Sequence, residues 1–169
     1  DAESVNCNVY DLKNHLDKKY DIVFCSYGVT GWLPDLDSWA EIISHFLKPG
    51  GFFYYVEFHP MVWMFDDSFE KIEYPYFNTE EPIKIISSST YADRNLKLQE
   101  INEFGWNHSL SEIFNSLTAS GLRVEYIHEF PFSPYNIFPG MYQSEDGYWR
   151  MSKFGDKLPM LFSIKAVKP

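Results

Sequence analysis

Two apolar segments separated by an amphipathic helix constrain the fold of this chain more than any other feature. Residues 22–25 and 52–58 are almost continuously apolar, which is typical of parallel strands covered on both faces. Between them, apolar residues recur at helical spacing over residues 36–46, and a Pro-Gly-Gly turn follows at 49–51. A strand, a helix and a strand in this order predict a βαβ unit with a right-handed crossover.

Capping-box patterns indicate where two helices begin. Ser38 with Glu41 precedes the apolar face of the first helix, and Ser109 with Glu112 opens a second helix that Gly121 ends. The remaining segments predict shorter elements: a weak strand at 5–9, a short helix within 11–20, a β-hairpin from strands 83–91 and 96–104, and two closing strands at 122–130 and 158–167.

Charge and cysteine usage narrow the possible partners. The formal net charge is −10, from 24 acidic and 14 basic side chains, so nucleic acid and anionic membrane surfaces are not expected partners. No apolar run approaches the about 18 residues needed to span a bilayer. Cys7 and Cys25 form neither a CxxC pair nor a metal-ligand pattern, so we expect free thiols, no metal site and a cytoplasmic protein.

Three motifs carry a resemblance to the later half of the class I S-adenosylmethionine-dependent methyltransferases. Tyr20 to Phe24, read as Tyr-Asp-Ile-Val-Phe, resembles the fourth strand of that family. Phe46 to Gly51 resembles its turn before the fifth strand, and Asn8 to Leu12 stands where members carry a segment after the third strand. The resemblance covers nearly all of the chain. Each motif alone is loose, and their order and spacing make the match specific.

The resemblance implies a fold and an activity. The fold is a Rossmann-like, doubly wound α/β sheet that is mostly parallel, with an antiparallel closing strand and a β-hairpin insertion. Residues 1–169 would form one partial domain, with 61–106 as an inserted lid and hairpin region. The activity is transfer of a methyl group from S-adenosylmethionine, the cosubstrate, to a small-molecule acceptor.

The chain departs from the family at its start, because the first two strands and the glycine-rich cofactor loop have no counterpart in it. In the family's strand order, 3-2-1-4-5-7-6, this leaves the fourth strand with an unpaired edge. An open edge invites pairing with another chain, so self-association is possible. We also expect this chain alone to be inactive and to bind S-adenosylmethionine weakly.

The resemblance and the expected strand ends together suggest site residues. Asn8 and the backbone of Val9 would contact the adenine, and Cys25, Ser26 and Tyr27 would line the methionine end of the cofactor. Trp32, His59, Trp63 and Tyr135 would contact the acceptor. If the acceptor must lose a proton, His59 or, less favourably, Glu57 would take it.

Several alternatives stay open at this stage. The many aromatic residues of 61–81 and 133–154 either pack a lid over the sheet or line an apolar acceptor pocket. The domain could also be a methyltransferase-like binding module without catalysis, or a fragment of a nicotinamide-dependent dehydrogenase, since both enzyme classes use doubly wound sheets. The antiparallel closing strands and the Pro-Gly-Gly turn disfavour the dehydrogenase.

Overall fold

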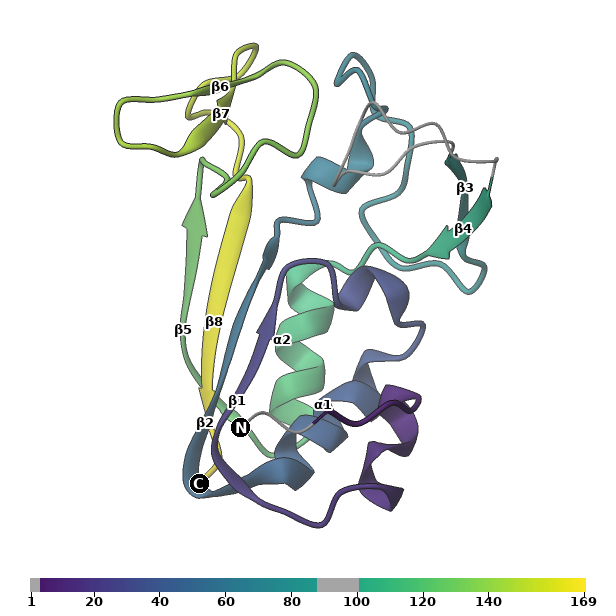
Figure 1. Cartoon of the computed structure of the whole chain (residues 1–169), viewed down its shortest axis with the longest axis vertical. Coiled ribbons are helices and arrows are strands. Elements are labelled where there is room, and N and C mark those ends of the chain that lie inside the picture. Colours follow the sequence, from purple (N-terminus) through teal and green to yellow (C-terminus); the bar gives the residue numbers. More distant parts are fainter. Residues whose placement is uncertain (1–3, 88–100) are drawn as a thin grey trace.

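One mixed four-stranded sheet organises the molecule (Figure 1). The computed structural model describes residues 4–87 and 101–169. Strand β1 pairs in parallel with β2, and β2 and β5 each pair antiparallel with β8. The order across the sheet is β1 (Tyr20–Ser26), β2 (Leu47–Phe58), β8 (Leu161–Val167) and β5 (Arg123–Phe130).

The predicted βαβ unit is confirmed. Helix α1 (Leu36–Phe46) connects β1 to β2, and Val23 lies opposite Phe53 in the parallel register. Its Trp39 packs on the helix-facing side of β2, with ring centroids 5.6 Å from Phe53 and 5.5 Å from Tyr55. All three aromatic rings are buried, so their burial holds the helix on the sheet.

The two helix starts differ in how well the sequence predicts them. Helix α2 (Leu110–Ala119) begins as predicted, with the Ser109 hydroxyl accepting from the backbone N–H of Glu112. The predicted start of α1 at Ser38 is wrong by three residues. Asp35 is the N-cap, because its carboxylate accepts from the N–H groups of residues 37 and 38 and an ionised cap forms stronger bonds than a hydroxyl.

The strand predicted at residues 5–9 is not formed, and the predicted helix within 11–20 is shorter and shifted. A 3₁₀ helix, η1 (Val9–Asn14), occupies this segment, and Asn8 caps it by accepting from the backbone N–H of Tyr10 at 3.0 Å. No described strand pairs with residues 5–9, so no neighbouring strand among the described residues holds them extended.

The expectation of a mostly parallel sheet is wrong for the described residues, where β1 and β2 form the one parallel pair.

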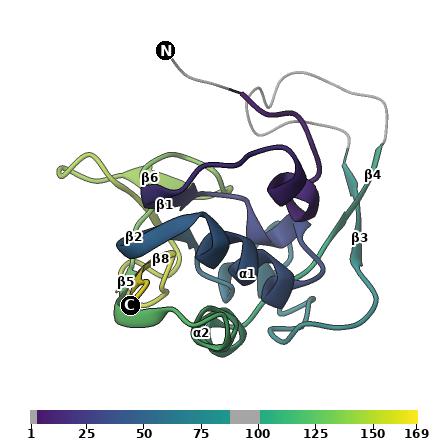
Figure 2. The ribbon, with the colours of Figure 1, turned by 90° about the horizontal axis from the view of Figure 1, so that it is seen from below.

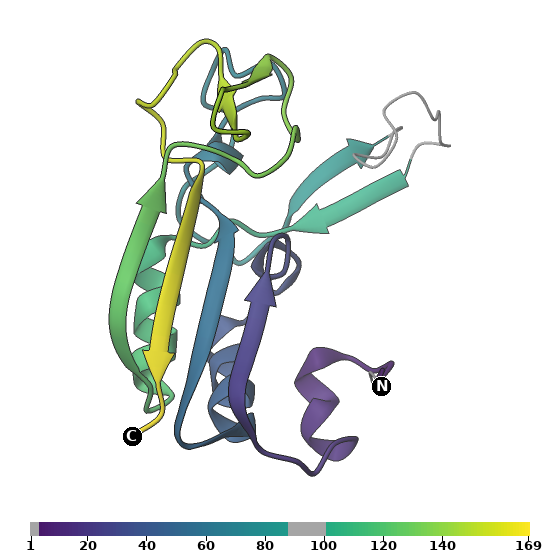
Figure 3. The same cartoon turned by 60° about the vertical axis from the view of Figure 1, so that its left-hand side comes forward.

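Among the described residues, one face of the sheet carries no helix, and β1 and β5 are its two edge strands. Both α-helices lie on the same side of the sheet (Figure 2 and Figure 3), and β1 is an edge strand, as expected. On the other face, Ile22 and Phe24 are 54% and 58% exposed. A second helical layer, as in a doubly wound sheet, is thus not part of the described chain.

Two hairpins lie beyond the end of the sheet at which β1 and β2 finish (Figure 1). Strands β3 (Ile83–Ser87) and β4 (Ile101–Gly105) pair antiparallel, as predicted; the predicted turn at 92–95 lies outside the described residues. The second hairpin, β6 (Met141–Gln143) with β7 (Trp149–Met151), was expected only as an aromatic loop. None of the helices in the described ranges is long and apolar enough to cross a membrane.

Candidate functional site

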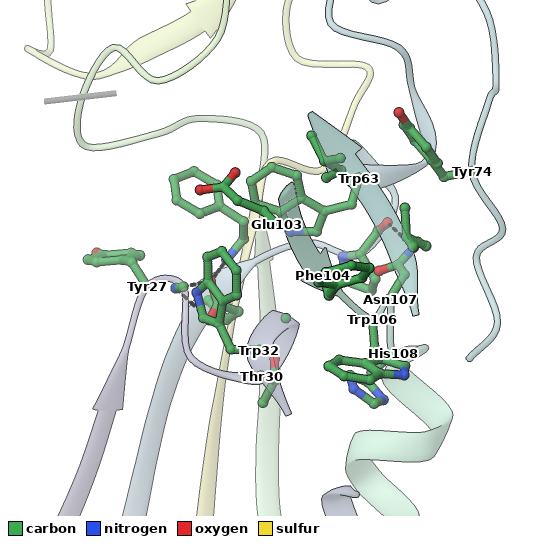
Figure 4. Close-up of a pocket in the computed structure, with 18 of the residues that line it drawn as sticks. Tyr27, Thr30, Trp32, Trp63, Tyr74, Glu103, Phe104, Trp106, Asn107 and His108 are labelled. Atoms are coloured by element: carbon green, nitrogen blue, oxygen red, sulfur yellow. Dashed lines mark hydrogen bonds between the residues drawn. The ribbon is translucent and has the colours of Figure 1, made fainter. Parts of the chain in front are cut away.

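A cavity of about 500 Å³ lies beyond the carboxyl ends of β1 and β2 (Figure 4). Its wall is formed by the loop after β1, the end of β2, parts of 60–74, the β3–β4 hairpin with the residues that follow it at 106–108, and residues 113, 135, 137 and 162. Ligands of open α/β sheets bind beyond the carboxyl ends of the strands. The position of the cavity therefore agrees with the predicted location of a site.

Glu57 joins the tips of the two parallel strands. Both of its carboxylate oxygens accept from the backbone N–H of Gly28 at 2.7 Å, and one also accepts from that of Val29 at 2.9 Å. The other accepts from the N–H of Phe58 at 2.8 Å. The residue is 4% exposed, and no ion pair joins it to a cation among the described residues. Its negative charge is therefore compensated by backbone amides, which fix the loop after β1.

A second buried bond fixes the next turn of this loop. The hydroxyls of Thr30 and Tyr55 lie 2.7 Å apart, and both residues are buried. Burial raises the pKa of Tyr55 well above its ordinary value, so the phenol stays neutral and able to donate. The bond anchors the 3₁₀ helix η2 (Thr30–Trp32) on β2. As a result, Trp32 is presented at the cavity while 56% exposed.

The β3–β4 hairpin docks on this same turn. The backbone N–H of Trp106 donates to the carbonyl of Gly31 at 2.9 Å. A Cβ added at Gly105 would lie 2.9 Å from that carbonyl oxygen, closer than side-chain carbons approach. Gly105 therefore allows the hairpin to rest directly on the η2 backbone.

Two buried polar side chains after β4 tie the hairpin to the rest of the site. The Asn107 amide donates to the carbonyls of Pro60, at 3.0 Å, and Pro75, at 2.9 Å. The His108 imidazole lies 2.8 Å from the carbonyl of Leu33 and 2.9 Å from a carboxylate oxygen of Glu112. Both residues border the cavity. Neither residue is among the site residues that the sequence predicts.

The structure brings four predicted aromatic residues to the cavity: Tyr27, Trp32, Trp63 and Tyr135. Phe58 links three of them, because its ring centroid lies 5.8 Å from those of Tyr27, Trp63 and Tyr135. Figure 4 shows Tyr27, Trp32 and Trp63 arranged around the same space. Contacts among these rings stabilise the wall of the cavity.

His59 lies outside the cavity lining. It is 3% exposed, its Nδ1 accepts from the backbone N–H of Met61 at 3.1 Å, and its Nε2 lies 2.9 Å from a carboxylate oxygen of Glu129. Since Nδ1 accepts, Nε2 carries the proton and donates it to Glu129. Burial lowers the pKa of His59 despite this carboxylate. Both ring nitrogens are thus engaged in structural bonds.

The remaining predicted cofactor residues do not border this cavity either. Burial, and then repulsion from Glu57, raises the pKa of the Cys25 thiol to about 11, so Cys25 is a protonated packing residue. Ser26 ends β1 without reaching the lining. Asn8 and Val9 belong to the η1 turn, where the Asn8 side chain is engaged as a cap.

Comparisons with known proteins identify the fold. No protein-family model matches the sequence, and no curated protein matches it. Among solved structures, an S-adenosylmethionine-dependent methyltransferase from Mesorhizobium loti has a TM-score of 0.54 at 16% identity, over 95% of this chain and 67% of its own. One from Clostridium acetobutylicum has a TM-score of 0.53 at 12% identity, over 96% of this chain and 63% of its own.

A third structure, from Listeria monocytogenes and assigned to the same class, has a TM-score of 0.52 at 15% identity over 90% of this chain and 62% of its own. The chain therefore spans 62% to 67% of the lengths of these three matches. At 12% to 16% identity the likeness concerns the fold. The chain has the fold of the class I S-adenosylmethionine-dependent methyltransferases.

Proposed function

We propose that the protein transfers a methyl group from S-adenosylmethionine to a small-molecule acceptor. The observation that carries the proposal is the cavity at the tips of two adjacent parallel strands, where Glu57 binds the loop after β1 and aromatic rings border the space. Such a place is where doubly wound folds bind their ligands. The size of the cavity fits a small molecule.

The described residues fit one end of the cofactor. Tyr27 and Gly28 border the cavity directly after β1, and the ring of Tyr27 is suited to lie against a positively charged sulfonium. Asn8, proposed for the adenine end, has its side-chain oxygen engaged with Tyr10. This chain matches 62% to 67% of the length of the methyltransferase structures. In our proposal, strands that correspond to the unmatched part of those structures pair with the edge of β1, and they complete both the site and a doubly wound sheet.

When bound, S-adenosylmethionine supplies an activated methyl group. The residues of this chain then have to align the acceptor with it and exclude water, and positioning of this kind contributes roughly 7–11 kcal/mol to a rate. Trp32, Trp63 and the β3–β4 hairpin are placed to exclude water. Alignment does not require a base on the protein, in keeping with the engagement of Glu57 and His59 in structural hydrogen bonds.

Binding of S-adenosylmethionine, measured by calorimetry on the natural protein, tests the cofactor assignment. Tyr27→Ala should weaken binding about tenfold, because an aromatic contact at a desolvated cation is worth about 2 kcal/mol or somewhat less. Tyr142→Ala is the matched control, since Tyr142 is exposed on β6 and does not border the cavity. Equal effects of the two substitutions would contradict the assignment.

Transfer of labelled methyl from S-adenosylmethionine to a panel of small acceptors tests the activity itself. Binding without transfer to any acceptor would favour the alternative of a binding module without catalysis. Failure both to bind and to transfer would reject the enzyme.

A further inference from the structure

Glu103 places a carboxylate in the wall of the cavity without a protein partner. It lies on β4 opposite Ile85, borders the cavity and is half-buried. Within residues 4–87 and 101–169, no hydrogen bond or ion pair joins the Glu103 carboxylate to another side chain or to the backbone. Partial burial of an unpaired carboxylate is unfavourable. A cationic ligand that pairs with Glu103 therefore gains more binding free energy than it would from pairing with an exposed carboxylate.

The two faces of the hairpin separate the charges. Ile83, Glu103 and Gly105 are partly buried, whereas Lys84 and its cross-strand partner Phe104 are exposed. Neighbouring positions on a strand point to opposite faces. The Glu103 carboxylate and the Lys84 ammonium therefore lie on opposite faces of the hairpin, although both residues border the cavity.

The charge balance of the lining is acidic. Its carboxylates are Glu57, Asp67 and Glu103, and Lys84 is its one lysine or arginine. Glu57 is already compensated by backbone N–H groups, and Asp67 is exposed. The lining thus offers one partly buried carboxylate without a partner among the described residues, whereas its one lysine, Lys84, is exposed. This arrangement favours a cationic ligand and disfavours an anion.

Tryptophan indoles add a second interaction with cations. Trp32, Trp63 and Trp106 all border the cavity (Figure 4). Indole has the strongest attraction for cations among aromatic side chains, and pockets that combine aromatic faces suit ammonium groups. At about 500 Å³, the cavity accommodates a small molecule.

We propose that the acceptor is a small organic amine, cationic at neutral pH, and that Glu103 determines this specificity by pairing with its ammonium group. The inference rests on the proposed function for the transfer and on the cavity alone for the binding. In the transfer, the ammonium first releases one proton to solvent. The nitrogen lone pair then forms the N–C bond, and the S–C bond breaks with its electron pair remaining on sulfur.

Calorimetry with three probes of similar shape tests the charge preference: 2-phenylethylamine, 2-phenylethanol and 3-phenylpropionate. The amine should bind at least about tenfold more tightly than the propionate, because a charge-assisted hydrogen bond contributes about 1.5–3 kcal/mol. Glu103→Gln should remove this preference and leave 2-phenylethanol binding unchanged, which shows that the cavity is intact. Glu145→Gln is the matched control, because Glu145 is exposed and does not border the cavity, and it should change amine affinity less than about twofold, as expected for an exposed charge.

Two results would overturn the inference: propionate binding as tight as that of the amine, or an amine preference that survives Glu103→Gln. Titration of S-adenosylhomocysteine into the natural protein, on which the calorimetry with the three probes is also done, separates this inference from the proposed function. Cofactor binding without an amine preference rejects the specificity alone. An amine preference that depends on Glu103, without cofactor binding, supports the cation site and rejects the methyltransferase.

Discussion

The carboxylate of Glu57 should contribute more to stability than any other polar group of the site, and Glu57→Gln tests this. In the wild-type protein both oxygens accept backbone N–H bonds from three residues, at 2.7 to 2.9 Å. An amide offers one oxygen, so its NH₂ group must face at least one N–H donor at that distance. The substitution keeps the shape of the side chain and removes its ability to accept on both sides.

The loss can be estimated from these bonds. Leaving one buried donor without a partner costs about 1–3 kcal/mol, and the remaining bonds lose their charge assistance. Removal of a buried charge recovers part of its desolvation cost. We therefore expect the free energy of unfolding to fall by roughly 2–4 kcal/mol, measured by urea denaturation at pH 7 with the m-value checked for two-state behaviour.

Glu103→Gln serves as the control, because Glu103 has no partner among the described residues and its substitution should change stability by less than about 0.5 kcal/mol. The effect of Glu57→Gln should also be nearly independent of salt, since buried hydrogen bonds are screened much less than surface ion pairs. A loss below about 0.5 kcal/mol for Glu57→Gln, or a loss that disappears in 1 M salt, would refute this account of the loop.

Three further substitutions follow from the same contacts. Gly105→Ala should lower the free energy of unfolding by about 1–3 kcal/mol, because its Cβ would lie 2.9 Å from the Gly31 carbonyl oxygen; wild-type stability in a urea titration would contradict the close docking. Asn107→Ala should cost about 1–3 kcal/mol, since two carbonyls lose their donor, and an unchanged urea midpoint would speak against this. Burial lowers the pKa of His59 from its ordinary 6.5, so the unfolded state binds the proton first and stability should fall as the pH drops below about 6.5. His59→Gln should flatten that part of the pH profile, and identical profiles for the two proteins would count against a buried neutral imidazole.

The sequence predicts the core of the fold because its signals there are local and redundant. The apolar runs of β1 and β2, the face of α1 and the cap at Ser109 each specify one element. The prediction of a strand at residues 5–9 is wrong for a long-range reason, because a strand needs a neighbouring strand and none of the described strands pairs with this segment. Asn8 then finds a local partner in Tyr10 and forms a turn.

The site is less predictable because its contacts join distant segments. The hydrophobic periodicity of the sequence correctly places the ends of β1 and β2. Trp32 and Trp63 follow these two strand ends, and for that reason they border one cavity. Side-chain direction at the end of β2 decides the partners of two residues. Glu57 faces two backbone amides of the loop after β1, and His59 faces Glu129. Sequence spacing fixes the position of a residue on a strand but not its hydrogen-bond partner across the sheet.

Photocrosslinking of labelled S-adenosylmethionine to the natural protein, followed by peptide mapping, tests the central claim most directly. The account predicts that label enters the peptide containing Tyr27, directly after β1, and that unlabelled S-adenosylhomocysteine prevents it. Label confined to the β6–β7 hairpin, or labelling that S-adenosylhomocysteine does not reduce, would contradict a cofactor site at the tips of β1 and β2.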